Sequence, residues 1–178
     1  QLSYALGDLV AVTDPLGKTT NRVMDPAGRL TSVTNPLGQQ TRSAYDALNR
    51  LTQLTDPLGG RTHFTFDPNG NLLFVADARG SVTGYTYDPM DRLATRKDSL
   101  QLSESYAYDA GGNLTQFTDR KGQGTTFTSD ALGRRTQATY ADGSTTSYTY
   151  DAGNRLTQVV DSVAGTISRT YDNLDRLT

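Results

Sequence analysis

Cysteine is absent from this 178-residue chain, which excludes disulfides, thiolate chemistry and cysteine metal sites. No apolar run reaches the ~18 residues that a membrane-spanning helix requires. Lysine and arginine occur singly or in adjacent pairs and never in longer blocks, and the formal net charge is −2. We therefore expect neither a membrane span nor a nucleic-acid partner.

A helical pattern is missing as well, because no stretch sustains the apolar period of a helix and glycine or proline recurs throughout the chain. What the sequence has instead is an aspartate every 21 residues, without insertion or deletion. A fixed period of this size is typical of a repeat architecture in which each unit packs mainly on its neighbours. The aspartates are Asp25, Asp46, Asp67, Asp88, Asp109, Asp130, Asp151 and Asp172.

Each of these aspartates opens a predicted turn. Three residues later stands glycine, or an asparagine or aspartate that tolerates positive φ, which is typical of a type I turn. A second turn lies halfway through the repeat and is clearest as Asp56-Pro57-Leu58-Gly59. The segments beginning at Asp77, Asp98 and Asp161 depart from this motif, and we expect looser turns there. The glycines of the first turn are Gly28, Gly70, Gly112 and Gly133.

Two short segments rich in β-forming residues separate the turns, so one repeat is expected to be strand, turn, strand, turn. The second segment alternates aromatic residues with others, which places the aromatic side chains on one face. We interpret them as a cross-strand packing stripe, with a glycan- or peptide-binding face as the alternative. The stripe comprises Phe64, Phe66, Tyr85, Tyr87, Tyr106, Tyr108, Tyr148 and Tyr150.

Arginines stand near most of the repeated aspartates, and pairs between them along the rim of the sheet are expected to contribute about 0–1 kcal/mol each. Threonine, leucine and tyrosine occur at both odd and even positions along the predicted strands, so the alternation of side chains does not identify the inner face of the sheet. The arginines are Arg29, Arg50, Arg92, Arg134, Arg155 and Arg176.

Tight four-residue turns reverse the chain, which favours an all-β array of 21-residue β-hairpin repeats in one long, curled antiparallel sheet. A parallel β-solenoid with one coil per repeat is the alternative. Residues 1–178 are expected to form a single array of about eight units that is truncated within a repeat at both ends. The pattern frays at Gln101, Arg135 and Ala164, where we expect the regularity of the array to fail.

The repeated carboxylates do not indicate catalysis. A glycosidase needs a carboxylic acid in a unique environment, whereas these aspartates recur in equivalent places where each can bond to its own turn. His63, the only histidine, aligns with Arg42 and Gly84 of neighbouring repeats, which indicates a variable, exposed position. Residues 67–71 and 109–113 match neither the EF-hand nor the glycine-rich nonapeptide pattern of calcium loops. We predict no enzyme, no metal site and no cofactor.

The motifs Gly28-Arg29-Leu30-Thr31, Asp56-Pro57-Leu58-Gly59 and Tyr148-Thr149-Tyr150-Asp151 together resemble the signature of the Rhs/YD-repeat family. That family includes bacterial Rhs and wall-associated polymorphic toxins, the C component of insecticidal toxin complexes, and animal teneurins. The resemblance covers the whole chain and implies a spiralling antiparallel sheet that winds into a hollow shell. The repeat at Asp130 departs from the pattern, with Arg135 in place of leucine and Ala138 in place of a larger apolar residue.

The resemblance also implies a function: a wall segment of a β-shell that encapsulates a C-terminal toxin or other cargo in a secreted or cell-surface bacterial protein. The implied partners are further YD repeats and the C-terminal cargo or toxin domain of a parent protein. One alternative is an adhesive surface that binds a glycan or a protein. Another is self-association through the unpaired edges of the sheet.

Overall fold

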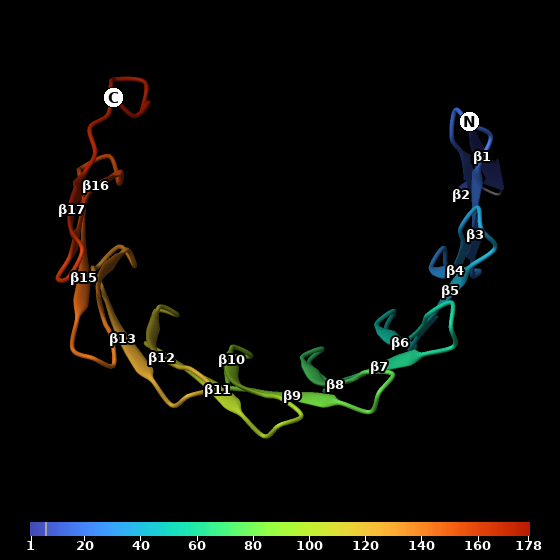
Figure 1. Cartoon of the computed structure of the whole chain (residues 1–178), viewed down its shortest axis with the longest axis horizontal. Coiled ribbons are helices and arrows are strands. Elements are labelled where there is room, and N and C mark those ends of the chain that lie inside the picture. The colour runs from blue at the N-terminus through green and yellow to red at the C-terminus, as the bar shows by residue number, and fades with distance from the viewer. Residues whose placement is uncertain (6) are drawn as a thin grey trace. The chain divides into compact units, whose positions relative to one another are not determined.

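The computed structural model describes residues 1–5 and 7–178, and in these residues it consists of β-strands joined by turns, without a helix (Figure 1). In the described part, no helix is long and apolar enough to cross a membrane. The strands are β1 (Leu2–Ala5), β2 (Asp8–Thr13), β3 (Thr19–Met24), β4 (Leu30–Thr34), β5 (Gln40–Tyr45), β6 (Leu51–Thr55), β7 (Arg61–Phe66), β8 (Leu72–Ala76), β9 (Val82–Tyr87), β10 (Leu93–Lys97), β11 (Ser103–Tyr108), β12 (Leu114–Thr118), β13 (Gly124–Ser129), β14 (Arg135–Thr139), β15 (Thr145–Tyr150), β16 (Leu156–Asp161) and β17 (Gly165–Ser168).

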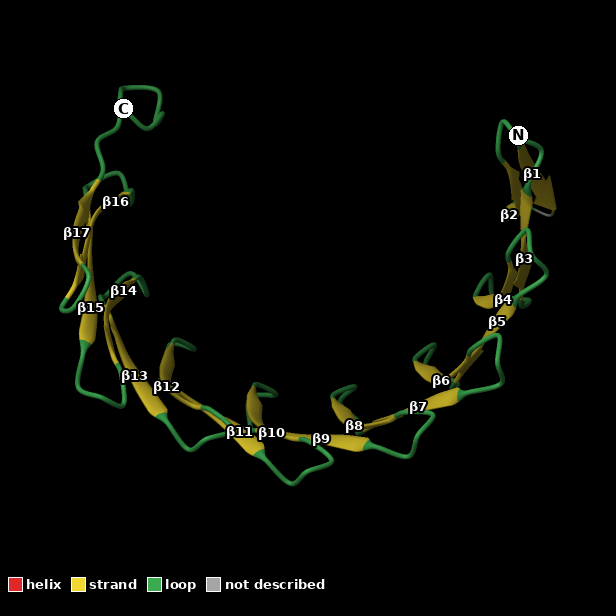
Figure 2. Cartoon of the chain, viewed as in Figure 1, coloured by secondary structure: helices red, strands yellow, loops and turns green. Residues whose placement is uncertain are grey.

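Consecutive strands pair antiparallel, so the chain runs as a meander in which strands and turns alternate (Figure 2). The same pairing continues from β10 to β17. The prediction of hairpin repeats in an antiparallel sheet is therefore confirmed. The parallel β-solenoid is wrong, because turns that close on four residues bring the next strand back beside the previous one.

The chain divides into two compact units, Gln1–Tyr85 and Thr86–Thr178. Each unit is built in the same way: a strand lies beside the strands that precede and follow it in the sequence. Each repeat thus rests on its neighbours, as expected for an array whose stability comes from contacts between successive units.

Hairpins whose turn is opened by one of the aspartates of the 21-residue period carry a β-bulge close to that turn. In the β11–β12 pair, Ala107 faces Gln116 and Tyr108 faces Leu114, which leaves Thr115 as the extra residue. Corresponding register shifts occur in the β3–β4, β5–β6, β7–β8, β13–β14 and β15–β16 pairs. An extra residue reverses the inward and outward parity of everything beyond it. This is why strict alternation along the sequence did not separate the two faces.

The two faces differ in exposure even though the sheet has little core. Along β7 and β11, exposed residues alternate with half-buried ones, and the half-buried positions carry the aromatic side chains. Among the described residues, Ala138 is the one hydrophobic residue that is fully buried, with Ser32 and Thr146 the buried polar ones. Contacts along the sheet therefore take the place of a conventional hydrophobic core.

The mid-repeat turns at Asp77 and Asp98 are as well closed as the turns that contain proline. The N–H of Gly80 bonds to the carbonyl oxygen of Asp77 at 3.0 Å, and the N–H of Gln101 bonds to that of Asp98 at 3.0 Å. Gln101 reaches this geometry with a φ of 67°, a conformation in which an L-residue is strained. The expectation of looser turns at these two positions, and of irregularity at Gln101, was wrong because the backbone bonds tolerate the substitutions.

The turn at Asp161 does differ. Asp161 pairs with Gly165 in the β16–β17 ladder, and its Oδ1 accepts the N–H groups of Val163 and Ala164. The chain therefore follows a different hairpin connection at this point, where the sequence motif had frayed at Ala164. The sequence motif also frays at Arg135. There the guanidinium lies 3.9 Å from the centre of the Phe127 ring, and Arg135 begins the regular strand β14.

Candidate functional site

The repeated aspartate organises its own turn with one carboxylate oxygen. Oδ1 of Asp25 accepts the N–H groups of Ala27 at 2.9 Å and Arg29 at 3.0 Å, and the N–H of Gly28 bonds to the Asp25 carbonyl at 2.9 Å. The hydrogen bond from the Arg29 N–H is the chief cause that holds the pKa of Asp25 below its ordinary value. Oδ2 of the same carboxylate remains available for a second partner.

The fourth position of the turn lies in the left-handed region of φ. Gly28 has a φ of 75°, and Asn49 and Asp91 reach 64° and 59° at equivalent positions. Asparagine and aspartate are the non-glycine residues that enter this region most readily. The other predicted glycines adopt the same sign of φ: Gly70 at 97°, Gly112 at 87° and Gly133 at 76°.

The arginine at the fifth position connects one repeat to the next. Nε of Arg29 donates to Asp25 Oδ2 at 2.6 Å, while its Nη1 donates to the carbonyl oxygen of Asp46, the turn aspartate of the following repeat, at 3.0 Å. Likewise, Nε of Arg92 donates to Asp88 Oδ2 at 2.7 Å, and its Nη1 donates to the carbonyl oxygen of Asp109 at 2.9 Å. We call this arrangement of an aspartate, its arginine and the next turn the inter-repeat latch.

An aromatic ring completes the latch. The guanidinium carbon of Arg29 lies 5.2 Å from the centre of the Tyr45 ring, within the range of a cation–π contact. The Tyr45 hydroxyl donates back to the carbonyl of Leu30 at 2.9 Å. Arg92 and Tyr108 repeat this geometry in the second unit, with a distance of 4.7 Å. Tyr45 and Tyr108 thus each contact the preceding repeat twice, because the ring lies beside the arginine and the hydroxyl donates to the carbonyl of the leucine that follows it.

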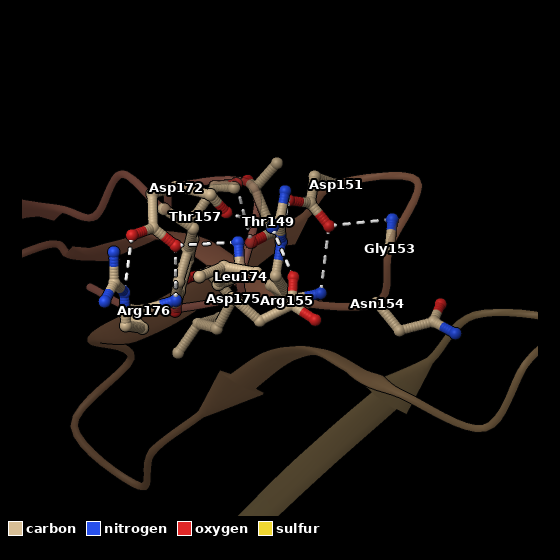
Figure 3. A network of polar contacts seen from close by, with 12 residues as sticks. Thr149, Asp151, Gly153, Asn154, Arg155, Thr157, Asp172, Leu174, Asp175 and Arg176 are labelled. Carbon is tan, nitrogen blue, oxygen red and sulfur yellow. Dashed lines mark hydrogen bonds and ion pairs between the residues drawn. The ribbon is translucent and has the colours of Figure 1, made fainter. Parts of the chain in front are cut away.

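Figure 3 shows the latch nearest the C-terminus. Arg155 bonds to Asp151 through Nε at 2.7 Å and pairs with the Asp175 carboxylate at 2.6 Å. Its Nη1 also donates to the carbonyl of Asp172 at 3.3 Å. Asp175 and Asp172 belong to the next turn, so the arginine ties two turns together through three oxygen atoms. Its guanidinium lies 5.0 Å from the centre of the Tyr171 ring.

Two repeats carry asparagine at the fifth position. Nδ2 of Asn71 donates to Asp67 Oδ2 at 3.0 Å, and Nδ2 of Asn113 donates to Asp109 Oδ2 at 2.9 Å. The shorter side chain preserves the bond within the turn. It lacks the planar fork with which arginine reaches two partners at once.

The threonine of the Gly-Arg-Leu-Thr motif occupies the β-bulge. The Thr31 hydroxyl donates to the carbonyl of Val23 at 3.0 Å, and the Thr157 hydroxyl donates to that of Thr149 at 3.0 Å (Figure 3). A bulge disrupts the ladder locally, and a hydroxyl at this place supplies a donor to the opposite strand. In this motif the glycine therefore provides the positive φ of the turn, and the arginine forms the latch. The leucine provides the carbonyl that accepts a hydrogen bond, and the threonine donates the hydrogen bond at the bulge.

The predicted aromatic stripe lies on the half-buried face, but its members make different contacts. Phe66 and Tyr150 lie beneath Arg50 and Arg134, at 5.0 and 4.7 Å. Tyr106 instead packs on the ring of Phe117, with centres 5.2 Å apart. The remaining members are half-buried: Phe64, Tyr85, Tyr87 and Tyr148. The arginine–ring contacts were missed, although the fixed spacing of arginine and the aromatic residue was visible in the sequence.

The mid-repeat turns use the same aspartate geometry without a latch. Oδ1 of Asp14 accepts the N–H groups of Leu16 and Lys18, each at 2.9 Å. The residue at the fifth position of these turns is not arginine. The aspartate thus makes the turn, and an arginine at the fifth position adds the latch.

The described residues contain no group of three histidine, aspartate or glutamate side chains able to hold a metal ion. His63 is exposed on β7. The recurring carboxylates are engaged by backbone N–H groups and by arginine or asparagine side chains of their own turns. This geometry serves the structure of the turn, because every such carboxylate is surrounded in nearly the same way.

Fold and site together define a class: an array of β-hairpins whose successive repeats are tied at their turns. The RHS Repeat family model matches residues 25–62, 66–101, 108–145 and 130–167, and this chain belongs to that family. No curated protein matches the sequence.

Solved structures of larger proteins share the fold, among them the following three. The first, described as TcdB2-TccC3-Cdc42, matches with a TM-score of 0.75 at 24% identity. A Tc holotoxin pore from Photorhabdus luminescens, which carries a TccC3 mutation, matches with a TM-score of 0.74 at 22% identity. A TcdB2-TccC3 protein without its hypervariable C-terminal region gives 0.73 at 23% identity. In each case the match covers 90% of this chain and 10% of the other, so the likeness is one of fold over a small part of those proteins.

Proposed function

We propose that this array is a non-catalytic wall segment of a β-shell that encloses a C-terminal toxin or other cargo of a secreted or cell-surface bacterial protein. The observation that carries the proposal is the inter-repeat latch. At Arg92, for example, it joins the turn of Asp88 to the turn of Asp109 by hydrogen bonds and an ion pair, with a cation–π contact to Tyr108, and so resists separation of neighbouring hairpins.

Membership in the RHS Repeat family supports this role, and so does the fold shared with the Tc structures. The use of polar residues supports it too, because the recurring aspartates and arginines bond to one another and to the backbone. A wall needs a sheet that persists without a hydrophobic core behind it. The latches supply contacts of that kind at every repeat that carries arginine.

The test uses the full-length protein that contains this array. Native protease digestion followed by mass spectrometry should reveal a protected polypeptide outside residues 1–178. The double variant Arg92→Ala/Arg155→Ala removes two latches and should make that polypeptide accessible at lower protease concentration.

The matched control is Arg79→Ala/Arg169→Ala, which removes two exposed arginines outside the latches while changing the net charge equally. Protection should survive in this control. If no segment outside the array is protected in the unmodified protein, the containment role is refuted. If both double variants behave alike, the latches do not maintain the wall.

A further inference from the structure

A hollow of about 340 Å³ interrupts the regular surface of the second unit. Its walls include two aromatic rings, Phe117 and Tyr140, and two carboxylates, Asp119 and Asp142, with the amide of Gln123 beside them. This volume lies at the lower end of the range of small-ligand pockets. The ring of Phe117 is held in place by its contact with Tyr106.

Tyr140 departs from the repeat pattern at this place. It stands at the first position of a mid-repeat turn, where Asn35 and Asp119 stand in other repeats. The turn closes without the usual side chain, because the N–H of Gly143 bonds to the Tyr140 carbonyl at 2.9 Å. The aspartate of this turn is Asp142, two residues after the position that aspartate occupies in other mid-repeat turns. The closure of the turn therefore does not require an aromatic ring. The Tyr140 hydroxyl lies 3.3 Å from that of Thr146, a hydrogen bond that holds the ring at the hollow.

Both carboxylates keep one oxygen available. Oδ1 of Asp119 accepts the N–H groups of Lys121 and Gln123, and Oδ1 of Asp142 accepts the N–H and the hydroxyl of Ser144. In the described part of the chain, the Oδ2 atoms of these two aspartates accept no hydrogen bond. The bonds from Ser144 also hold the pKa of Asp142 below its ordinary value, so its carboxylate is charged at neutral pH.

The local charge is not neutralised from within the hollow. No lysine or arginine lines it. The guanidinium of Arg120, the residue after Asp119, is held by Glu104 at 3.0 Å and by Asp98 at 3.3 Å. Two negative charges beside two aromatic rings favour a ligand that has a positive charge on an apolar stem. The carboxylates attract the positive charge, and the rings attract the charge and also contact the apolar stem.

We propose that this hollow binds the protonated end of a basic side chain, an arginine or lysine presented by a polypeptide. A neutral sugar could stack on the rings and donate hydroxyl groups to the carboxylates, but it carries no positive charge to balance theirs. Two carboxylates alone also provide too few ligands for a metal ion in a closed site. The inference is independent of the shell function, since the hollow is formed by residues of the second unit whether or not a cargo is enclosed.

The test is an NMR titration of the 178-residue chain with the peptide N-acetyl-Gly-Arg-Gly-amide. Saturable shifts should appear at the amides of residues 140–144. The same peptide with citrulline, which has the shape of arginine without its charge, should bind at least about threefold more weakly. Raising the NaCl concentration should weaken binding of the arginine peptide, because salt screens exposed charges.

Two variants locate the site. Asp142→Asn removes one charge but keeps an acceptor for Ser144, and Tyr140→Asn installs the residue that position 35 carries in an intact turn. Each should weaken binding about two- to fivefold. Asp77→Asn removes a charge from an equivalent turn without a hollow and should leave binding unchanged.

The proposal is overturned if the arginine peptide gives no saturable shift, or if the citrulline peptide binds equally well. It is also overturned if maltotriose binds these residues more tightly than the arginine peptide and without dependence on salt, which would make the hollow a sugar site. Such outcomes leave the protease-protection test of the shell untouched, so the two proposals can fail separately.

Discussion

At the residue scale, the decisive position is the fifth residue of each Asp-opened turn. Asp25 would form its turn with many residues at position 29, because Oδ1 bonds to backbone N–H groups. Arginine adds a hydrogen bond to the next turn, since its planar fork reaches the near carboxylate and the far carbonyl together. The Gly-Arg-Leu-Thr motif is thus part of both a turn and a contact between successive repeats.

Arg92→Ala tests the strength of that link. The variant loses the bond to the Asp109 carbonyl, the pair with Asp88 and the contact with Tyr108. We expect the free energy of unfolding to fall by about 1–2 kcal/mol, since the guanidinium is only partly exposed. Urea denaturation followed by circular dichroism measures the change.

Arg79→Ala is the control, because Arg79 is exposed at a mid-repeat turn, and it should change stability by no more than about 0.5 kcal/mol. Equal effects of the two substitutions would show that the latch contributes nothing beyond an ordinary surface arginine.

At the element scale, the hairpin combines a turn, a bulge and a latch within a few residues. The bulge threonine supplies the donor for the opposite strand, and the turn aspartate fixes the chain reversal. Because these features recur at one end of each hairpin, the two ends of a hairpin differ chemically. The latched end is held to its neighbour by the arginine of its own turn. The mid-repeat end has no such recurring contact and relies mainly on the strand ladder, with the Arg120–Asp98 pair as a local addition.

Acid should weaken these turns. In the folded state the pKa values of Asp25, Asp46 and Asp151 are held below the ordinary value of 3.8, first by the N–H of the arginine four residues later. The unfolded chain then binds more protons than the folded chain at acidic pH. The stabilisation is complete above the ordinary value and is lost as pH falls below it.

Urea midpoints measured from about pH 7 down to about pH 2.5 should therefore stay level to about pH 5 and then decline. The variant Asp46→Asn/Asp151→Asn should decline less steeply, because two of the titrating groups are gone. A midpoint that is the same at about pH 3 and at about pH 6 would contradict this account.

At the scale of the whole molecule, stability should depend on the number of repeats. Strands contact the strands beside them in sequence, and Ala138 is the one fully buried hydrophobic residue in the described part. Each added repeat then contributes its own term and one interface term. A long array is stable because many such modest terms are added together.

A fragment of residues 98–178, which begins at a mid-repeat turn, should unfold at a lower urea concentration than the full chain. The slope of its unfolding free energy against urea should also be smaller, because less surface is exposed. Circular dichroism at several urea concentrations measures both. If the fragment and the full chain share one midpoint, repeats do not stabilise one another over this distance.

Much of this structure could be predicted from the repeat itself. The period of 21 residues, the turn residues and the β-forming segments together specify an antiparallel meander. The two faces of the sheet could not be assigned from the sequence, because an extra residue at the bulge, such as Thr115, reverses which side chains point to which face within the hairpin. Looser turns were also wrongly expected at Asp98, since Gln101 adopts the positive φ that glycine adopts elsewhere.

By itself the sequence determined where the chain turns, because Asp, Gly and Pro bias the backbone within a few residues of themselves. Only the tertiary structure decided what the recurring side chains touch. Arg29 and Tyr45 lie in different repeats, and their contact depends on the register of the strands between them. The hollow at Tyr140 arose in the same way, from residues of adjacent repeats brought together by pairing rather than by sequence.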